Sequence, residues 1–173
     1  MGWIIILVCD IVVAWALYLL MKPIHPGLSL LGAWLRLVYA AILGIAVMRL
    51  IDVLLLTDGT GYLSLLTSNQ LQGQVMLELE AFEKIWSIGL IVFGGHILMI
   101  GWIALKWDRI PKIISLFLLA ASIGYVVIHL FNILIPQYKG IIIMLEYIFI
   151  VPMIAGELGL GLWLLFKRKG LFS

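Results

Sequence analysis

The sequence has little charge and almost no cysteine. Of its 173 residues, 12% are Asp, Glu, Lys or Arg, whereas about 25% is usual for a soluble domain. The formal net charge is +2, and no aromatic side chains are interleaved with a Lys/Arg patch, so we exclude nucleic acid as a partner. The one cysteine, Cys9, lies in an apolar run and has no intramolecular partner for a disulfide.

Familiar catalytic and metal-binding patterns are also missing. The chain has no GxSxG element, no phosphate loop and no plausible Ser/His/Asp arrangement. His96, Glu157 and Asp10 could supply three metal ligands, but no His-x-x-x-His spacing supports such a site. A haem held by His96 and His129 is disfavoured because they differ by about 10 Å in depth along their helices. We therefore predict no metal and no cofactor, and we favour a role that is not enzymatic.

Hydrophobic residues, by contrast, make up 65% of the chain. Crossing the hydrocarbon core of a bilayer takes about 20 apolar residues in a helix. Five stretches are long enough, near residues 2–21, 28–57, 85–106, 112–135 and 140–166. The sequence thus predicts an all-α fold in which residues 1–173 form a single polytopic bundle of five transmembrane helices.

One connection, residues 63–84, is too long and too apolar for a simple loop. Apolar residues recur there at helical spacing, whereas Gln and Glu occupy the other faces. The apolar positions are Leu71, Val75, Leu79, Phe82 and Trp86. We predict an amphipathic helix outside the cytoplasm that runs into the third span, either packed on the bundle as an extension or acting as a lid.

Basic residues are distributed unevenly between the two ends of the predicted bundle. Cytoplasmic loops of membrane proteins carry an excess of Lys and Arg. One end has Lys22, Lys106, Arg109, Lys112 and residues 167–169, and the other has Lys84 and Lys139. We therefore expect a cytoplasmic C-terminus and an N-terminus on the outer side.

Four ionisable residues in four different spans share an inner layer. Each such residue costs about 2.5–3.5 kcal/mol on insertion scales and usually faces the interior of a bundle. Counted at about 1.5 Å per residue from the cytoplasmic ends, all four lie about 12–16 Å deep. They are Asp10, Arg36, His96 and Glu157.

A second set of ionisable residues forms an outer layer, about 8–12 Å from the opposite helix ends. Its members are Arg49, Asp52, His129 and Glu146. Each layer holds one arginine, two carboxylates and one histidine, so each can become neutral by binding or sharing a proton.

These layers have two interpretations that the sequence leaves open. They are either sites for a proton, an ion or a small polar ligand, or clips that hold helices together. Asp10 and Arg36 fit a clip, because a guanidinium can reach a carboxylate across a small mismatch in depth. Glu157 and His96 fit a site, and we predict a direct or one-water hydrogen bond in which the pair shares one proton.

Glycine and proline in the spans have structural explanations. Gly94, Gly95, Gly101, Gly124, Gly156, Gly159 and Gly161 allow helices to approach closely. We expect those of the third and fifth spans to bring Glu157 to His96. Pro152 is expected to kink the fifth span shortly before Glu157.

The sequence resembles a family of bacterial membrane proteins known as domain of unknown function 4386. The resemblance covers nearly the whole chain and is carried by "DIVVAWALYLLMKP", "LLGAWLRLVYAAILG", "AFEKIWSIGLIVFGGHILMIGWIAL", "IGYVV" and "PMIAGELGLGLWLLFKRKG". Asp10, Arg36, His96 and Glu157 fall on positions that the family favours as polar, whereas His129 stands where relatives tend to carry an aspartate. The family usually has a further span before the first one here. The resemblance implies a multi-pass protein of the bacterial cytoplasmic membrane and no particular activity.

Three functional hypotheses follow from these observations. The first is a membrane protein that binds or conducts a small solute or a proton at Asp10, Arg36, His96 and Glu157. The second is a structural or regulatory subunit, in an oligomer or with a partner subunit, whose polar residues act only as clips. The third is an integral membrane enzyme.

Overall fold

The computed structural model describes residues 2–58 and 67–167, and over these residues it consists of helices and short turns without a strand. The helices of this described part are α1 (Gly2–Met21), α2 (Pro26–Thr57), α3 (Ser68–Lys106), α4 (Lys112–Leu134) and α5 (Lys139–Lys167). Within the same ranges, each of the five helices is long and apolar enough to cross a membrane. The predicted all-α fold is confirmed. Residues 63–66 of the predicted amphipathic segment and basic residues 168 and 169 lie outside the described residues.

Local sequence signals explain where two of the helices begin. His25 caps α2, because its Nδ1 accepts a hydrogen bond from the Leu28 amide at 3.2 Å, and Pro26 follows at the first helical position. Thr67 and Gln70 form a reciprocal capping box at the start of α3. These caps satisfy amide groups that would otherwise lack partners in the first turn.

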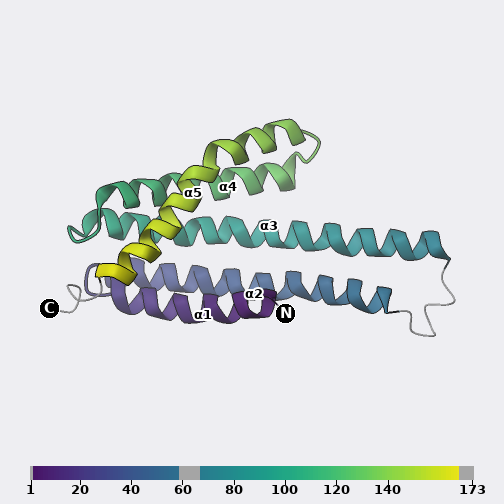
Figure 1. Ribbon diagram of the computed structural model, residues 1–173, viewed down its shortest axis with the longest axis horizontal. Helices are drawn as coiled ribbons and strands as arrows, with labels where there is room; N and C mark the ends of the chain where they lie inside the picture. The colour runs from purple at the N-terminus through teal and green to yellow at the C-terminus, as the bar shows by residue number, and fades with distance from the viewer. Residues whose placement is uncertain (1, 59–66, 168–173) are drawn as a thin grey trace.

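Sequential helices pack against each other, and α3 lies between α2 and α4 (Figure 1). Helices α1, α2 and α3 run side by side along the long axis of the molecule. Helix α5 packs on α4 and then crosses the bundle obliquely towards the end that holds the α1–α2 and α3–α4 turns. As a result α1 and α5 each pack mainly on a different neighbour, α1 on α2 and α5 on α4.

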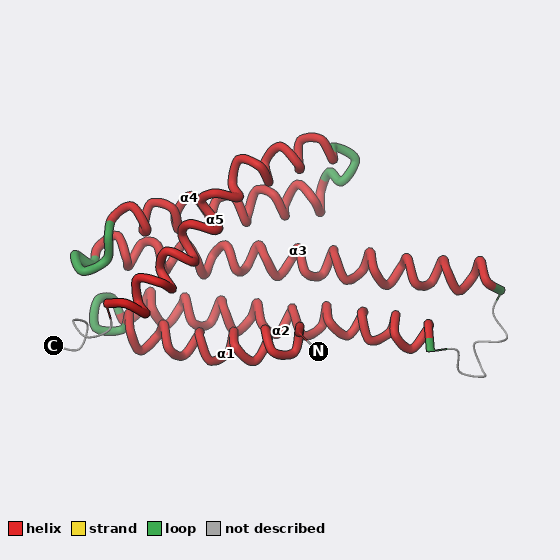
Figure 2. The backbone as a smooth tube through the Cα atoms, in the orientation of Figure 1, coloured by secondary structure: helices red, strands yellow, loops and turns green. Residues whose placement is uncertain are grey.

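Helix α5 changes direction partway along its length (Figure 2), and it contains Pro152. Proline lacks the amide that would bond to the preceding turn, and its ring crowds the carbonyl four residues earlier, so it bends a helix. The bend follows the prediction and directs the second half of α5, which carries Glu157, across the bundle.

The predicted amphipathic segment is the first part of α3, continuous with the predicted third span. Phe82 is buried there, and the Trp3 ring of α1 packs edge-on against Phe82 and Trp86 at centroid distances of 5.4 and 5.2 Å. One turn before Phe82, Glu78 accepts a hydrogen bond from Arg49 of α2 at 3.3 Å. The segment is therefore a packed extension of the bundle, although Leu79 is 37% exposed rather than covered.

Glycines permit close helix contacts, but not between the helices that we expected. A Cβ on Gly94 would meet Val126 of α4 at 2.9 Å, and a Cβ on Gly156 would meet the Leu118 backbone of α4 at 3.0 Å. Gly95 faces Leu35 of α2 instead. The packing role is confirmed for Gly94 and Gly156, but both face α4, so the expectation that these glycines join α3 to α5 is wrong.

Candidate functional site

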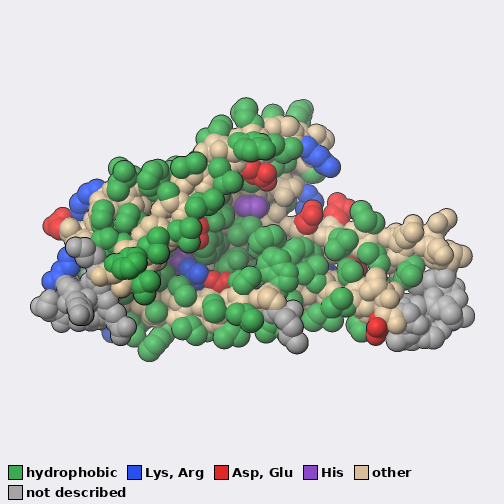
Figure 3. Space-filling model, in the orientation of Figure 1, with side chains coloured by type: hydrophobic (Ala, Val, Ile, Leu, Met, Phe, Trp, Pro, Cys, Tyr) green, Lys and Arg blue, Asp and Glu red, His purple; other side chains and the backbone are tan. Residues whose placement is uncertain are grey.

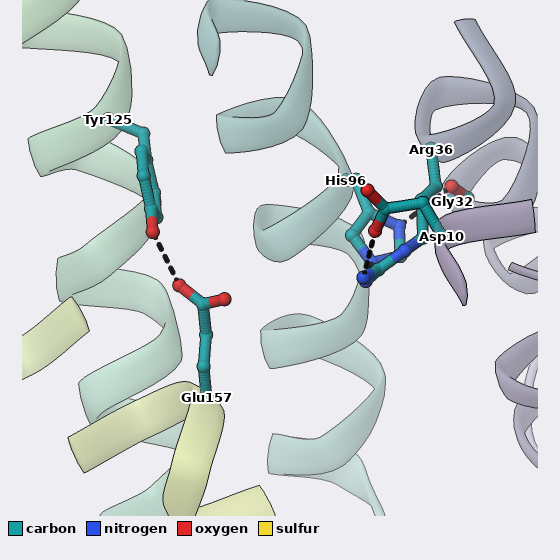
Figure 4. Close-up of polar contacts among 6 residues, drawn as sticks. All are labelled: Asp10, Gly32, Arg36, His96, Tyr125 and Glu157. Carbon is teal, nitrogen blue, oxygen red and sulfur yellow. Dashed lines mark hydrogen bonds and ion pairs between the residues drawn. The ribbon is translucent and has the colours of Figure 1, made fainter. Parts of the chain in front are cut away.

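Asp10, Arg36 and His96 form a hydrogen-bonded chain across α1, α2 and α3 (Figure 4). Arg36 Nη2 donates to Asp10 Oδ1 at 2.6 Å, which is an ion pair whose side chains are 14% and 9% exposed. Arg36 Nη1 lies 3.1 Å from His96 Nε2. The predicted contact between Asp10 and Arg36 is present, and His96 joins it.

The partners of His96 fix the position of its proton. Its Nδ1 lies 2.8 Å from the Gly32 carbonyl oxygen, which can only accept a hydrogen bond. Its Nε2 faces the Arg36 guanidinium, which can only donate. Both hydrogen bonds form only when the imidazole is neutral and protonated at Nδ1. His96 therefore holds Arg36 in place and has no free nitrogen for Glu157.

Glu157 is bonded to a residue that the sequence analysis did not consider. The Tyr125 hydroxyl of α4 donates to Glu157 Oε1 at 2.6 Å. Figure 4 shows this pair as a group separate from Asp10, Arg36 and His96. The predicted hydrogen bond between Glu157 and His96 is wrong, because α5 packs on α4 and both nitrogens of His96 are already engaged.

Phe93 of α3 contacts both polar groups. Its ring packs edge-on against Tyr125 at a centroid distance of 5.2 Å, and the Arg36 guanidinium carbon lies 5.3 Å from the ring centroid on the other side. Phe93 is 6% exposed. A cation is attracted to an aromatic face, so Phe93 supports Arg36 as well as spacing the two groups.

The two groups nevertheless face one cavity of about 350 Å³. Among the described residues, its lining comes from all five helices. Its polar or ionisable side chains are Arg36, His96 and Glu157. The remaining lining is apolar or glycine: Val13, Ala16, Leu17, Ile97, Ile100, Leu118, Leu160, Gly161 and Leu164. Pockets for small molecules typically have about 300–1,000 Å³, apolar walls and a few convergent polar groups.

Helix α5 packs mainly on α4 rather than on α1 or α3, and this arrangement leaves the space of the cavity between them. Gly156 fixes that contact, since its missing side chain allows the Leu118 backbone to approach. Five residues further on, Gly161 lines the cavity, and a Cβ there would meet nothing within 4 Å. Figure 3 shows acidic, basic and histidine side chains together in a hollow of an otherwise largely hydrophobic face. Glycine on α5 therefore serves packing at one position and leaves space at the other.

Of the four residues of the predicted outer layer, the structure brings together Arg49 and Asp52 but not His129 and Glu146. Arg49 donates to Asp52 and to Glu78, both at 3.3 Å, on the α2 side of α3. His129 Nδ1 lies 3.3 Å from the Ser87 hydroxyl, on the α4 side. Glu146 lines a separate pocket of about 800 Å³ near the α4–α5 turn. The expectation of one joint layer is wrong, because α3 stands between α2 and α4.

Sequence reasoning overlooked several polar partners in the α3–α4 interface. Ser87 also accepts a hydrogen bond from Asn132 Nδ2 at 3.2 Å, and Lys84 donates to the Asn132 carbonyl at 2.7 Å. The uncharged polar residues of the spans were the missed signal, because a tyrosine or asparagine inside a bundle also needs a hydrogen-bond partner. A count of uncharged polar residues in the spans would have included Tyr125 and Asn132.

Residues 2–58 and 67–167 contain no group of three or more His, Cys, Asp or Glu side chains that could hold a metal ion. Asp10 and Glu157 are engaged with Arg36 and Tyr125 respectively, and His96 with Gly32 and Arg36. The three candidate metal ligands are therefore distributed over two separate hydrogen-bonded groups.

The structure thus defines a class of protein: a bundle of membrane-type helices with a mostly apolar cavity that contains a few polar side chains. The chain belongs to the family described as "Domain of unknown function (DUF4386)", whose profile matches residues 1–167. It is 29% identical over 126 residues to an uncharacterized protein of Archaeoglobus fulgidus. That match covers 73% of this chain and 62% of the relative. No solved structure matches the chain.

Proposed function

We propose that this protein is a multi-pass membrane protein that binds a small amphiphilic molecule in the cavity lined by Arg36, His96 and Glu157. The observation that carries the proposal is the cavity itself. Helices held together only by polar clips would close around them, because interiors pack tightly. Here Arg36, His96 and Glu157 instead line about 350 Å³ of space together.

Asp10 has a supporting role in this proposal. It is 7% exposed, does not line the cavity and neutralises Arg36 from behind. A ligand would meet the Arg36 and His96 side chains on one wall and the Glu157 carboxyl on another. The apolar walls between them would cover its hydrophobic part.

The experiment is native mass spectrometry of the protein purified in mild detergent from its own membranes. A bound small molecule is expected on the wild type and is expected to be lost in Gly161→Leu, which fills the cavity without meeting protein atoms near its Cβ. Gly140→Leu is the matched control, because Gly140 also lies in open space on α5 but does not line the cavity. An identical set of bound masses on all three proteins would favour the clip hypothesis instead.

We also propose that the helices lie in the cytoplasmic membrane, with the C-terminus in the cytoplasm. The α1–α2 and α3–α4 turns lie at one end (Figure 1), which carries the basic residues Lys22, Lys106 and Lys112. Thiol labelling in intact cells tests this in a Cys9→Ser background, since Cys9 is exposed. Gln137→Cys should react with a membrane-impermeant reagent, and Asp108→Cys should react only after lysis; the reverse result would overturn the orientation.

A further inference from the structure

Glu157 is the one ionisable side chain of the described cavity lining whose charge is not balanced. Asp10 and Arg36 cancel each other through their ion pair. His96 is neutral, because its two hydrogen bonds require the Nδ1-protonated form. Within residues 2–58 and 67–167, the hydrogen-bond partner of Glu157 is the Tyr125 hydroxyl. The charge of the cavity therefore depends on Glu157 alone.

One oxygen of Glu157 is free to meet a ligand. Tyr125 donates to Oε1, and Figure 4 shows Oε2 directed away from Tyr125 towards the side of α3. Glu157 lines the cavity, so its carboxyl borders the space that a ligand would occupy. The carboxyl is thus oriented by α4 and presented to the cavity by α5.

An anionic ligand fits this cavity poorly. Arg36 is the basic group of the lining, but its Nη2 is already 2.6 Å from Asp10, and Nη1 donates to His96. Its Nε is buried without a partner and lies beyond the reach of solvent. An anion at Arg36 would have to share the guanidinium with Asp10, which already neutralises its charge, and it would also face the Glu157 carboxyl across the same space.

An ionised Glu157 in apolar surroundings needs either a proton or a cation, because an unpaired buried charge is costly. The titratable groups that interact electrostatically with it are Tyr125 on α4, Arg36 and Tyr39 on α2, and Asp10 on α1, with His96 on α3 lining the same cavity. Of these groups, Arg36 carries the opposite charge, but Asp10 already neutralises that charge through their ion pair. The balancing positive charge must then come from outside the chain.

We propose, resting on the proposed function, that the cavity takes a lipophilic organic cation, which pairs with the Glu157 carboxylate in place of a proton. In this exchange the protonated carboxyl releases its proton to solvent as the cation binds, so the charge inside the cavity stays constant. The hydrophobic body of the cation lies against the apolar lining, and Tyr125 keeps the carboxylate oriented.

Two ions of nearly equal size and opposite charge test the proposal. Tetraphenylphosphonium and tetraphenylborate are each titrated into the protein in uncharged detergent, with binding followed by equilibrium dialysis and proton release by an indicator dye in weak buffer. We expect saturable binding of tetraphenylphosphonium with release of a proton, and no saturable binding of tetraphenylborate. Glu157→Gln should lower the affinity for tetraphenylphosphonium by more than about tenfold and abolish proton release.

Two further variants distinguish a specific loss of binding from a loss of folding. Gly161→Leu keeps the carboxyl but fills the cavity, so it should also lose tetraphenylphosphonium binding. Glu146→Gln removes an exposed carboxyl from the same helix, outside the cavity, and should leave both readouts unchanged. Equal binding of both ions, or binding to Glu157→Gln as tight as to the wild type, would overturn the proposal.

Failure of this proposal and failure of the proposed function are distinguishable. If tetraphenylborate binds instead and Gly161→Leu abolishes that binding, the cavity is a ligand site but the assigned charge is wrong. If neither ion binds, the cation proposal is overturned, and the native mass spectra of wild type, Gly161→Leu and Gly140→Leu decide the proposed function separately.

Discussion

Arg36 lies between Asp10 and His96 and donates a hydrogen bond to each, at 2.6 and 3.1 Å. The three side chains come from three helices, so one guanidinium links α1, α2 and α3. A cation with two acceptors is also held in one orientation, which a single salt bridge would not ensure. This arrangement stabilises the bundle and at the same time defines one wall of the cavity.

Replacing Asp10 by Asn should destabilise the protein strongly, because Arg36 would keep its charge and lose its counter-ion. Breaking a buried pair by removing one partner typically costs about 3–5 kcal/mol. The measurement is the free energy of unfolding in sodium dodecyl sulfate, followed by circular dichroism. Asp108→Asn is the control, since its pair with Lys112 is exposed to solvent and should contribute little.

A double variant separates the charge effect from packing. Asp10→Leu combined with Arg36→Met removes both charges, and replacement of a buried ion pair by apolar residues is often neutral or stabilising. We therefore expect the double variant to unfold at a higher detergent fraction than Asp10→Asn. A double variant even less stable than Asp10→Asn would show that the pair matters through packing or through His96 rather than through charge.

Two of the three histidines should be opposite tautomers. His96 donates from Nδ1 to the Gly32 carbonyl, whereas Nδ1 of His25 accepts from the Leu28 amide, so neutral His25 carries its proton on Nε2. Nitrogen NMR of protein labelled at histidine should show both tautomers, assigned by their loss in His96→Gln and His25→Gln. A His96 signal with both nitrogens protonated would contradict the hydrogen-bond assignment.

Much of the fold could be predicted from the sequence, because hydrophobic run length determines where membrane-type helices form. Depth along a helix was also predictable, since the rise per residue is constant. This is why Asp10, Arg36 and His96 were placed at one level, where they do meet.

The direction in which each helix faces could not be predicted in the same way. Glu157 matches His96 in depth, but the partner of α5 is decided by the contact between Gly156 and the Leu118 backbone. The outer residues Arg49 and His129 contact α3 on opposite sides and at different levels, at Glu78 and at Ser87, which lie about 13 Å apart along the helix. Lateral placement depends on the close packing of several helices at once, and a pattern within one helix does not contain it.

Gly156 and Gly161 should respond differently to the same substitution. In Gly156→Ala the new Cβ would lie 3.0 Å from the Leu118 amide nitrogen and 3.1 Å from the Phe117 carbonyl carbon, and backbone atoms cannot move aside cheaply. We expect a loss of about 1–3 kcal/mol in the free energy of unfolding. Gly161→Ala should cause no loss, because its Cβ would enter open space. Equal effects of the two substitutions would contradict the packing of α5 on α4.

Tyr125→Phe should release the Glu157 carboxyl without disturbing the surrounding packing. The substitution removes only the hydroxyl that donates to Glu157 Oε1 at 2.6 Å, and the ring keeps its contact with Phe93. The net loss of stability should be about 1 kcal/mol, as for one hydrogen bond.

Infrared spectroscopy gives a direct readout: the carboxyl band that disappears in Glu157→Gln should shift in Tyr125→Phe, because a hydrogen bond weakens the carbon–oxygen stretch. Tyr147→Phe, at an exposed position of the same helix as Glu157, should leave that band in place. An unshifted band in Tyr125→Phe would mean that a group other than Tyr125 orients Glu157.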